Sequence, residues 1–178
     1  MAVQAYVKIK GAKQGQFKGE GVRTGPGAGM IPIVRFASGA TAPRDASSGI
    51  ATGKRQWQPI RITKEWGAAS PQLLQALTAN ERLPSVVFEF FRADKAGKEQ
   101  LHYRITLQNA FVSSISSSLD LTSAAGTPYA GHELEDVELT FQSIMVEDVA
   151  DKTTATDDWH EISPQHVIQA PIRPSVPA

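Results

Sequence analysis

The chain has 178 residues, of which 41% are hydrophobic, so it suits one folded domain and leaves little room for a second large one. Eighteen Lys and Arg balance eighteen Asp and Glu, which excludes a whole-molecule charge that would attract nucleic acid or an anionic membrane. Because cysteine is absent, neither a disulfide framework nor a thiolate metal site can form.

The first residues alternate in polarity. Val3, Ala5, Val7 and Ile9 are apolar and the residues between them are mostly polar, which predicts a strand and not the continuous apolar run of a secretory signal. No run of roughly 18 apolar residues follows, so we expect no membrane insertion. If the protein leaves the cell, we expect it to use a dedicated machine.

A long connection stands between two predicted strands. Residues 38–54 combine Gly, Ser, Thr, Pro and charge, and they greatly exceed the ~4 to 6 residues of an ordinary connection. Loops of this length are usually functional or disordered. Residues 57–66 then alternate around Ile60 and Ile62 and predict a strand.

A short helix is predicted next. Ser70 can accept a hydrogen bond from the first free amide groups, and Pro71 suits the first helical position. Leu73, Leu74 and Leu77 would form one apolar stripe that covers a side of a sheet.

Residues 86–91 predict a strand with apolar groups on both faces. Val86, Phe88 and Phe90 point one way, whereas Val87 and Phe91 point the other way together with a glutamate. We therefore expect something other than water to cover the second face.

The last part of the chain predicts two more strands and a tail. Residues 101–111 alternate strictly, and residues 133–149 alternate with a phase shift that predicts a bulge near Gln142 or Ser143. From residue 151 onward the pattern ends, and residues 160–178 read as a flexible, proline-containing tail with little to bury.

Three patterns in the sequence are candidate sites. The GIATGKR sequence at residues 49–55 departs from a phosphate-binding loop in its glycine spacing, and no helix follows it. In HELED, His132 and Asp136 share one strand face while Glu133 and Glu135 take the other, so a metal site is not favoured. No serine lies in a nucleophile elbow. We expect no catalytic residue, no cofactor and no metal, and hence no enzyme.

Four segments together resemble the Hcp family of the bacterial type VI secretion system. They are PRDASSGIATGKRQWQPIRITKEW, SPQLLQAL, LPSVVFEFFR and TTATDDW. The resemblance implies a mainly β fold, a β-barrel of two antiparallel sheets with one short α-helix alongside. It covers residues 1–159 as one tube domain and leaves residues 160–178 as the tail.

The resemblance also implies a function. Family members form hexameric rings that stack into the inner tube, which a contractile sheath propels. They dock on a spike protein, carry or chaperone effector proteins in the lumen, and pass from the bacterial cytoplasm to the outside or into target cells without a signal peptide. No nucleic acid partner is implied.

Two sets of residues receive hypothetical roles in such an assembly. Val87 and Phe91 are assigned to the interface between subunits. The long loop is assigned to contacts between stacked rings through Pro43, Arg44, Asp45, Lys54 and Arg55.

Two other functions stay open from the sequence. One is the tail tube of a phage or a related contractile injection device, which shares the architecture. The other is a monomeric β-sandwich module that binds a ligand on Trp57, Trp66 and Tyr129, although such aromatics more often pack in a core or an interface.

Overall fold

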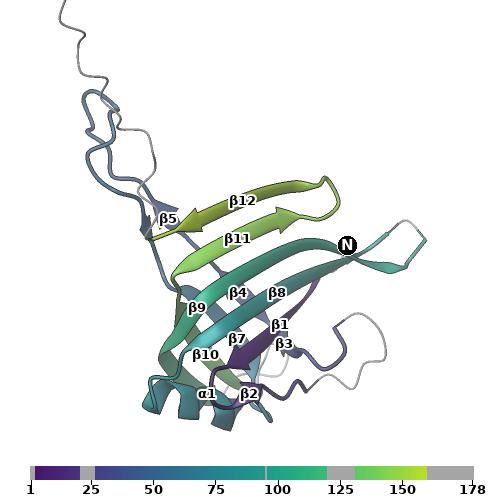
Figure 1. Ribbon diagram of the computed structural model, residues 1–178. Coiled ribbons are helices and arrows are strands. Elements are labelled where there is room, and N and C mark those ends of the chain that lie inside the picture. Colours follow the sequence, from purple (N-terminus) through teal and green to yellow (C-terminus); the bar gives the residue numbers. More distant parts are fainter. Residues whose placement is uncertain (1–2, 21–26, 95, 120–130, 160–178) are drawn as a thin grey trace, which may run out of the picture.

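The computed structural model describes residues 3–20, 27–94, 96–119 and 131–159, and this part of the chain forms twelve strands and one helix (Figure 1). In chain order the elements are β1 (Val3–Gly11), β2 (Gly15–Gln16), β3 (Ile31–Ile33), β4 (Arg35–Ala37), β5 (Ala40–Thr41), β6 (Gln56–Trp57), β7 (Ile60–Glu65), α1 (Ser70–Thr78), β8 (Leu83–Ala93), β9 (Glu99–Leu119), β10 (Glu133–Thr140), β11 (Ser143–Asp148) and β12 (Thr153–Asp158). Within the described ranges, no helix is long and apolar enough to span a membrane.

Two antiparallel sheets share the long strand β9. Up to Ala110, β9 pairs with β8 and β11, and from Phe111 it pairs with β10. One sheet therefore contains β2, β3, β1, β8, β9, β11 and β12, and the other contains β9, β10, β7 and β4. Asn109 has a φ of 49° where β9 changes sheets, a left-handed conformation that asparagine tolerates better than most residues. The predicted fold class is confirmed.

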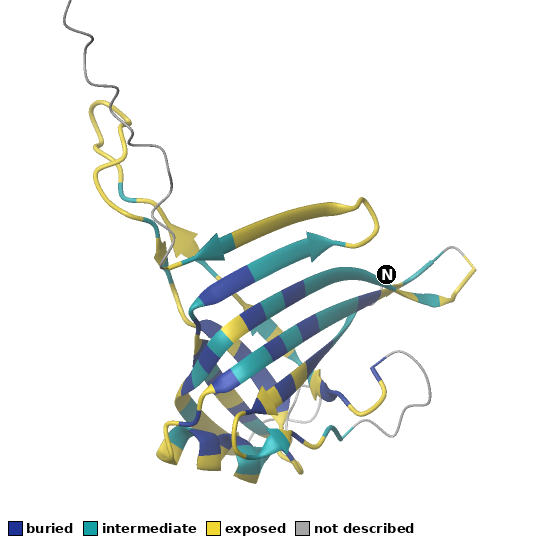
Figure 2. Ribbon diagram, viewed as in Figure 1, coloured by how far each residue is buried: buried dark blue, intermediate teal, exposed yellow. Residues whose placement is uncertain are grey.

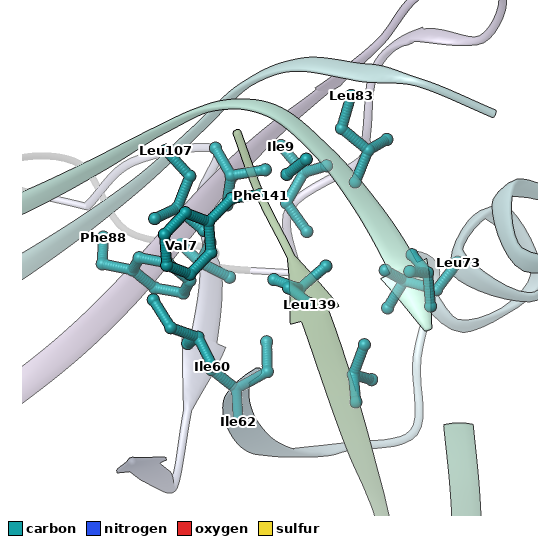
Figure 3. Packing of buried hydrophobic residues seen from close by; sticks show 14 of the residues in the cluster. Val7, Ile9, Ile60, Ile62, Leu73, Leu83, Phe88, Leu107, Leu139 and Phe141 are labelled. Carbon is teal, nitrogen blue, oxygen red and sulfur yellow. The ribbon is translucent and has the colours of Figure 1, made fainter. Parts of the chain in front are cut away.

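The main core fills the space between the sheets. Val7, Phe88 and Leu107 come from the first sheet, and Ile62 and Leu139 come from the second (Figure 3). All five are fully buried. Buried residues alternate with more exposed ones along these strands (Figure 2), as the period of two predicts.

Helix α1 lies at one end of the two sheets (Figure 1) and corrects two predictions. Leu74 is 54% exposed, and Ala76 is buried beside Leu73 instead, because residues three apart share a helix face. Ser70 makes no capping hydrogen bond within the helix, and Ala69 occupies the N-cap position. Pro71 lies in the first turn as the second helical residue, one position later than predicted.

The predicted strand at residues 133–149 is two strands in different sheets. β10 pairs with β7 and the second half of β9, whereas β11 pairs with β12 and the first half of β9. The chain changes sheets at Phe141 and Gln142, so the predicted bulge there is wrong. A change of sheet shifts the apolar phase because the core then lies on the other side of the strand.

Strand β12 also corrects the prediction that regular structure ends at residue 151. Its residues are Thr, Ala and Asp and are mostly exposed, so they carry no hydrophobic period. The strand is held by its backbone pairing with β11. The whole predicted tail at 160–178 lies outside the described residues.

Glu81, just after α1, stabilises the turn between β1 and β2 through hydrogen bonds. Its buried carboxylate accepts hydrogen bonds from the backbone N–H of Lys13 at 2.6 Å and of Gln14 at 2.9 Å, and from the Gln14 side chain at 2.8 Å. Burial opposes ionisation, but the hydrogen bonds from Gln14 and Lys13 outweigh it and lower the pKa of Glu81. A side chain at Gly11 would place its Cβ 2.5 Å from this carboxylate, so the turn requires glycine there.

We expect Glu81→Gln to destabilise the fold by about 1–3 kcal/mol near pH 7, because two backbone donors lose a charged acceptor. The folded pKa of Glu81 lies below its ordinary value of 4.5, so this contribution is present above pH 4.5 and is lost as pH falls through the folded pKa. Urea unfolding across this range should show the gap between variant and wild type closing in acid. Glu133→Gln, at an exposed site, is the control. A gap that stays constant with pH would contradict the prediction.

Candidate functional site

The long predicted loop is a two-stranded arm, defined here as residues 40–57. β5 pairs with β6 at its base, an isolated bridge joins Arg44 to Ala51, and the N–H of Thr52 donates to the carbonyl of Pro43 at 3.0 Å. The arm projects well beyond both sheets (Figure 1). This backbone pairing shows that the segment is an ordered projection and not an irregular loop.

The tip of the arm is organised around Asp45. Its carboxylate accepts hydrogen bonds from the hydroxyls of Ser47 and Ser48 and from their backbone N–H groups at 3.0 and 2.8 Å. These hydrogen bonds, led by the one from the Ser47 hydroxyl, hold the pKa of Asp45 well below its ordinary range. Arg44 donates to the carbonyl of Gly49 at 3.1 Å. The charges of Arg44 and Asp45 thus shape the turn, and Ile50 beside them is 68% exposed.

The base of the arm is clamped to the end of β12. The guanidinium of Arg55 pairs with the carboxylate of Asp157 and donates to the carbonyl of Asp158 at 2.6 Å. The indole N–H of Trp57 donates to the same Asp157 carboxylate at 2.6 Å. The hydrogen bond from Arg55 is the main cause that lowers the pKa of Asp157; burial opposes it and Trp57 adds to it. The arm therefore meets the sheet at a defined angle.

We expect Asp157→Asn to loosen the arm at its base and to cost about 1–2 kcal/mol, discounted because the ion pair is partly exposed. The lowered pKa means that the clamp is intact above pH 3.8 and is lost as pH falls through the folded pKa. Hydrogen exchange of the amides of β5 and β6 measures the effect. Asp151→Asn, an exposed change at the turn before β12, should leave that exchange unchanged.

The outer face of the first sheet is the other candidate surface. Val87 is half-buried there and lines a hollow of about 510 Å³ with Lys8, Glu89 and Arg104 among others. Arg104 spans three strands: its guanidinium lies 3.1 Å from the carboxylate of Glu89 on β8 and 3.8 Å from that of Glu147 on β11. Val87 thus offers an apolar surface beside the alternating charges of Glu89, Arg104 and Glu147.

Phe91 has a different environment from Val87. It is 5% exposed and packs edge-to-face against Tyr6, with ring centroids 5.8 Å apart, in a cluster that includes Met30 and Leu101. The sequence predicts that something other than water covers the second face of the strand at residues 86–91. At Phe91 that face is covered by residues of the same chain. Of the two residues assigned to a subunit interface, Val87 is the one whose surface is left partly open.

The residues of HELED separate in the structure. Glu135 is buried, and its carboxylate accepts hydrogen bonds from the Lys64 ammonium at 2.9 Å and from the Ser70 hydroxyl at 2.6 Å. His132 lies at the surface, 2.7 Å from Glu65. The described ranges hold no group of three or more potential metal ligands.

Sequence reasoning missed the buried pair of Lys64 and Glu135, although a signal was present. Lys64 continues the apolar phase of Ile60 and Ile62 in β7, and Glu135 has the phase of Val137 in β10. Opposite charges on the core phase of two strands indicate a buried ion pair when those strands are neighbours, as β7 and β10 are.

The aromatic residues considered for ligand stacking are largely engaged. Trp57 is tied to Asp157 and packs edge-to-face on Phe141 at 5.7 Å. Trp66 is partly exposed, and its indole N–H donates to the carbonyl of Leu134 at 3.0 Å. Tyr129 lies outside the described residues. Trp57 and Trp66 are thus each held by contacts within their own chain.

Comparison with known proteins identifies this architecture. The model of the family described as "Type VI secretion system effector, Hcp" matches residues 6–147. The chain belongs to the Hcp family. A curated relative, the "Major exported protein" of Pseudomonas aeruginosa, is 33% identical over 168 residues, which cover 89% of this chain and 96% of that protein.

Solved Hcp structures have the same fold. A crystal structure of an Hcp protein matches 90% of this chain and 99% of its own with a TM-score of 0.80 at 27% identity. The secreted protein Hcp3 from Pseudomonas aeruginosa matches 90% of this chain and 100% of its own with a TM-score of 0.71, also at 27% identity. The resemblance stated from the sequence motifs is confirmed.

Proposed function

We propose that this protein is a structural subunit of the inner tube of a type VI secretion system, in which six copies close into a ring and rings stack into a tube. The observation that carries the proposal is the match to the Hcp family over residues 6–147. A chain with this role needs surfaces for self-assembly and no catalytic centre, and the projecting arm and the partly open face around Val87 support the proposal.

Ring closure requires two different complementary patches on each subunit, since head-to-tail contacts close when the rotation fits. Strand β12 supplies one: among the described residues its only strand partner is β11, so residues 153–156 on its other edge can pair with a neighbouring strand. The face around Val87 supplies apolar surface for another. We assign Val87 to the subunit interface, whereas Phe91 supports that face from within its own chain.

Stacking of rings is assigned to the arm. Its clamped base fixes the direction in which the tip projects, and its charged residues offer contacts whose individual exposed pairs are weak. Repetition around a ring supplies the strength. Pro43, Arg44 and Asp45 lie toward the tip, while Lys54 and Arg55 lie near the base.

The remaining partners follow from the assembly. We propose that the tube meets a spike protein at its end and a contractile sheath around it, and that effector proteins travel in its lumen. We also propose that the subunit is made in the bacterial cytoplasm and leaves it with the machine, without a signal peptide. The exported relative in Pseudomonas aeruginosa supports this route.

The ring is tested by native mass spectrometry at micromolar concentration, where we expect a hexamer. Val87→Asp should release folded monomers, because removing the introduced carboxylate from water at an interface is costly even beside Lys8 and Arg104. Phe91→Asp should instead reduce the β signal in circular dichroism, because Phe91 packs inside the chain. A wild type that is monomeric would contradict the ring, and an intact Val87→Asp hexamer would move Val87 out of the interface.

A further inference from the structure

A groove with aromatic walls lies at the corner where the two sheets part. Its volume is about 450 Å³, and Phe111, Phe141 and Trp159 line it. Trp159 follows β12 directly; its backbone N–H donates to the carbonyl of Gln142 at 3.1 Å, and its side chain is 50% exposed. The surfaces that the proposed function uses do not include this groove.

The polar groups of the groove are mainly donors. Asn109 donates its amide N–H to Gln142 Oε1 at 2.9 Å, which leaves the amide nitrogen of Gln142 without an acceptor in the described part of the chain. Arg82 is exposed and makes one long hydrogen bond, 3.4 Å, to Asn109. Aromatic faces beside unused N–H groups suit a ligand that offers flat apolar rings and carbonyl acceptors.

A polyproline II segment has this chemistry. It makes no internal hydrogen bonds, so its carbonyls face outward, and its rings pack into aromatic-lined grooves. The chain carries such a sequence at residues 171–177, Pro-Ile-Arg-Pro-Ser-Val-Pro. Because polyproline II has three residues per turn, Pro171, Pro174 and Pro177 would form one edge. Pro164 is seven residues before Pro171, which is not a multiple of three, so it would not lie on that edge.

We propose that the groove of Phe111, Phe141 and Trp159 is a binding site for a polyproline II segment and that its occupant is the segment 171–177 of the same chain. Eleven residues lie between Trp159 and Pro171, and the twelve residue-to-residue steps can span up to about 40 Å when extended, enough to return to the groove. A tether of this length gives a local concentration in the millimolar range, which favours the segment's own chain over another copy. The inference does not depend on ring assembly.

The full chain labelled with 5-fluorotryptophan tests the docking. The three tryptophan resonances in the fluorine NMR spectrum are assigned with single Trp→Phe variants, and the H₂O to D₂O shift of Trp159 reports its contact with water. We expect this shift to be roughly half as large in the wild type as in Pro171→Ala/Pro174→Ala/Pro177→Ala, because a docked anchor excludes water. Pro164→Ala is the matched control and should behave as wild type. An equal Trp159 shift in wild type and triple variant would overturn the proposal.

A spin label identifies the chain that supplies the occupant. Since the sequence contains no cysteine, Ala178→Cys gives one attachment site beside Pro177. Docking within the chain predicts broadening of the Trp159 resonance when label and fluorotryptophan are on the same chain, and the broadening should persist on dilution with unlabelled protein. Broadening confined to mixtures of singly labelled chains would overturn the own-chain occupant, and absence of broadening would overturn the docking.

Discussion

Replacing Lys64 with methionine is expected to destabilise the protein by about 3–5 kcal/mol, the largest effect that we expect from one substitution outside the apolar core. Lys64 is 0% exposed, and its ammonium donates to Glu135 at 2.9 Å, to the Ser70 hydroxyl at 3.1 Å and to the carbonyl of Glu65 at 2.5 Å. Among the described residues, the variant leaves the buried carboxylate of Glu135 with no counter-ion within hydrogen-bonding distance, and that is the main cost.

The same ammonium holds a second element in place. It lies 3.5 Å from Glu20, whose carboxylate also accepts a hydrogen bond from the N–H of Ala69 at the start of α1. Glu20 passes so close to Gly67 that a Cβ there would lie 2.1 Å from its carboxyl carbon. We therefore expect Lys64→Met to loosen the start of α1 as well as to lower global stability.

Two variants separate the buried charge from the loss of packing. Lys64→Met/Glu135→Leu should recover most of the lost stability in urea unfolding, because removing both charges removes the unpaired one. Arg61→Met breaks the exposed pair with Glu138 on the same two strands and should change stability little. If the double variant were as unstable as Lys64→Met, the ion pair would not be the source of the effect.

Replacing residues 43–53 of the arm with a short Gly-Ser linker is expected to abolish long tubes while single rings persist. This variant keeps Arg55 and Trp57, so the clamp to Asp157 stays and the sheet edge is undisturbed. Negative-stain electron microscopy measures tube length, and native mass spectrometry measures ring formation. Wild-type tubes should also shorten as salt rises, because salt screens exposed charge pairs.

Point variants in the arm distinguish the contribution of its shape to ring stacking from the contribution of its charges. Asp45→Asn weakens the hydrogen bonds that order the tip and should shorten tubes less than the linker does. Lys54→Gln removes an exposed charge near the base without altering the turn. Long tubes at wild-type yield in the linker variant would remove the arm from the stacking contact and leave recognition of cargo or spike as its role.

Local sequence determined most of the architecture of this protein. The alternation along residues 86–91 and 101–111 identifies strands because a side-chain period of two is a property of any extended chain. Pro71 and the following leucines place α1 for an equally local reason. The length of the segment at 38–54 marked it as a functional candidate, and the combined motifs identified the family.

Tertiary structure decided how these elements meet. The change of sheet at Phe141 and Gln142 and the strand β12 depend on pairing with β9 and β11, distant partners that no local period records. The same holds for the burial of Phe91 against Tyr6 and for the pair of Lys64 with Glu135, since each joins residues far apart in the chain. Whether a charge or an aromatic ring is exposed, clamped or buried depends on such neighbours, which only the folded chain brings together.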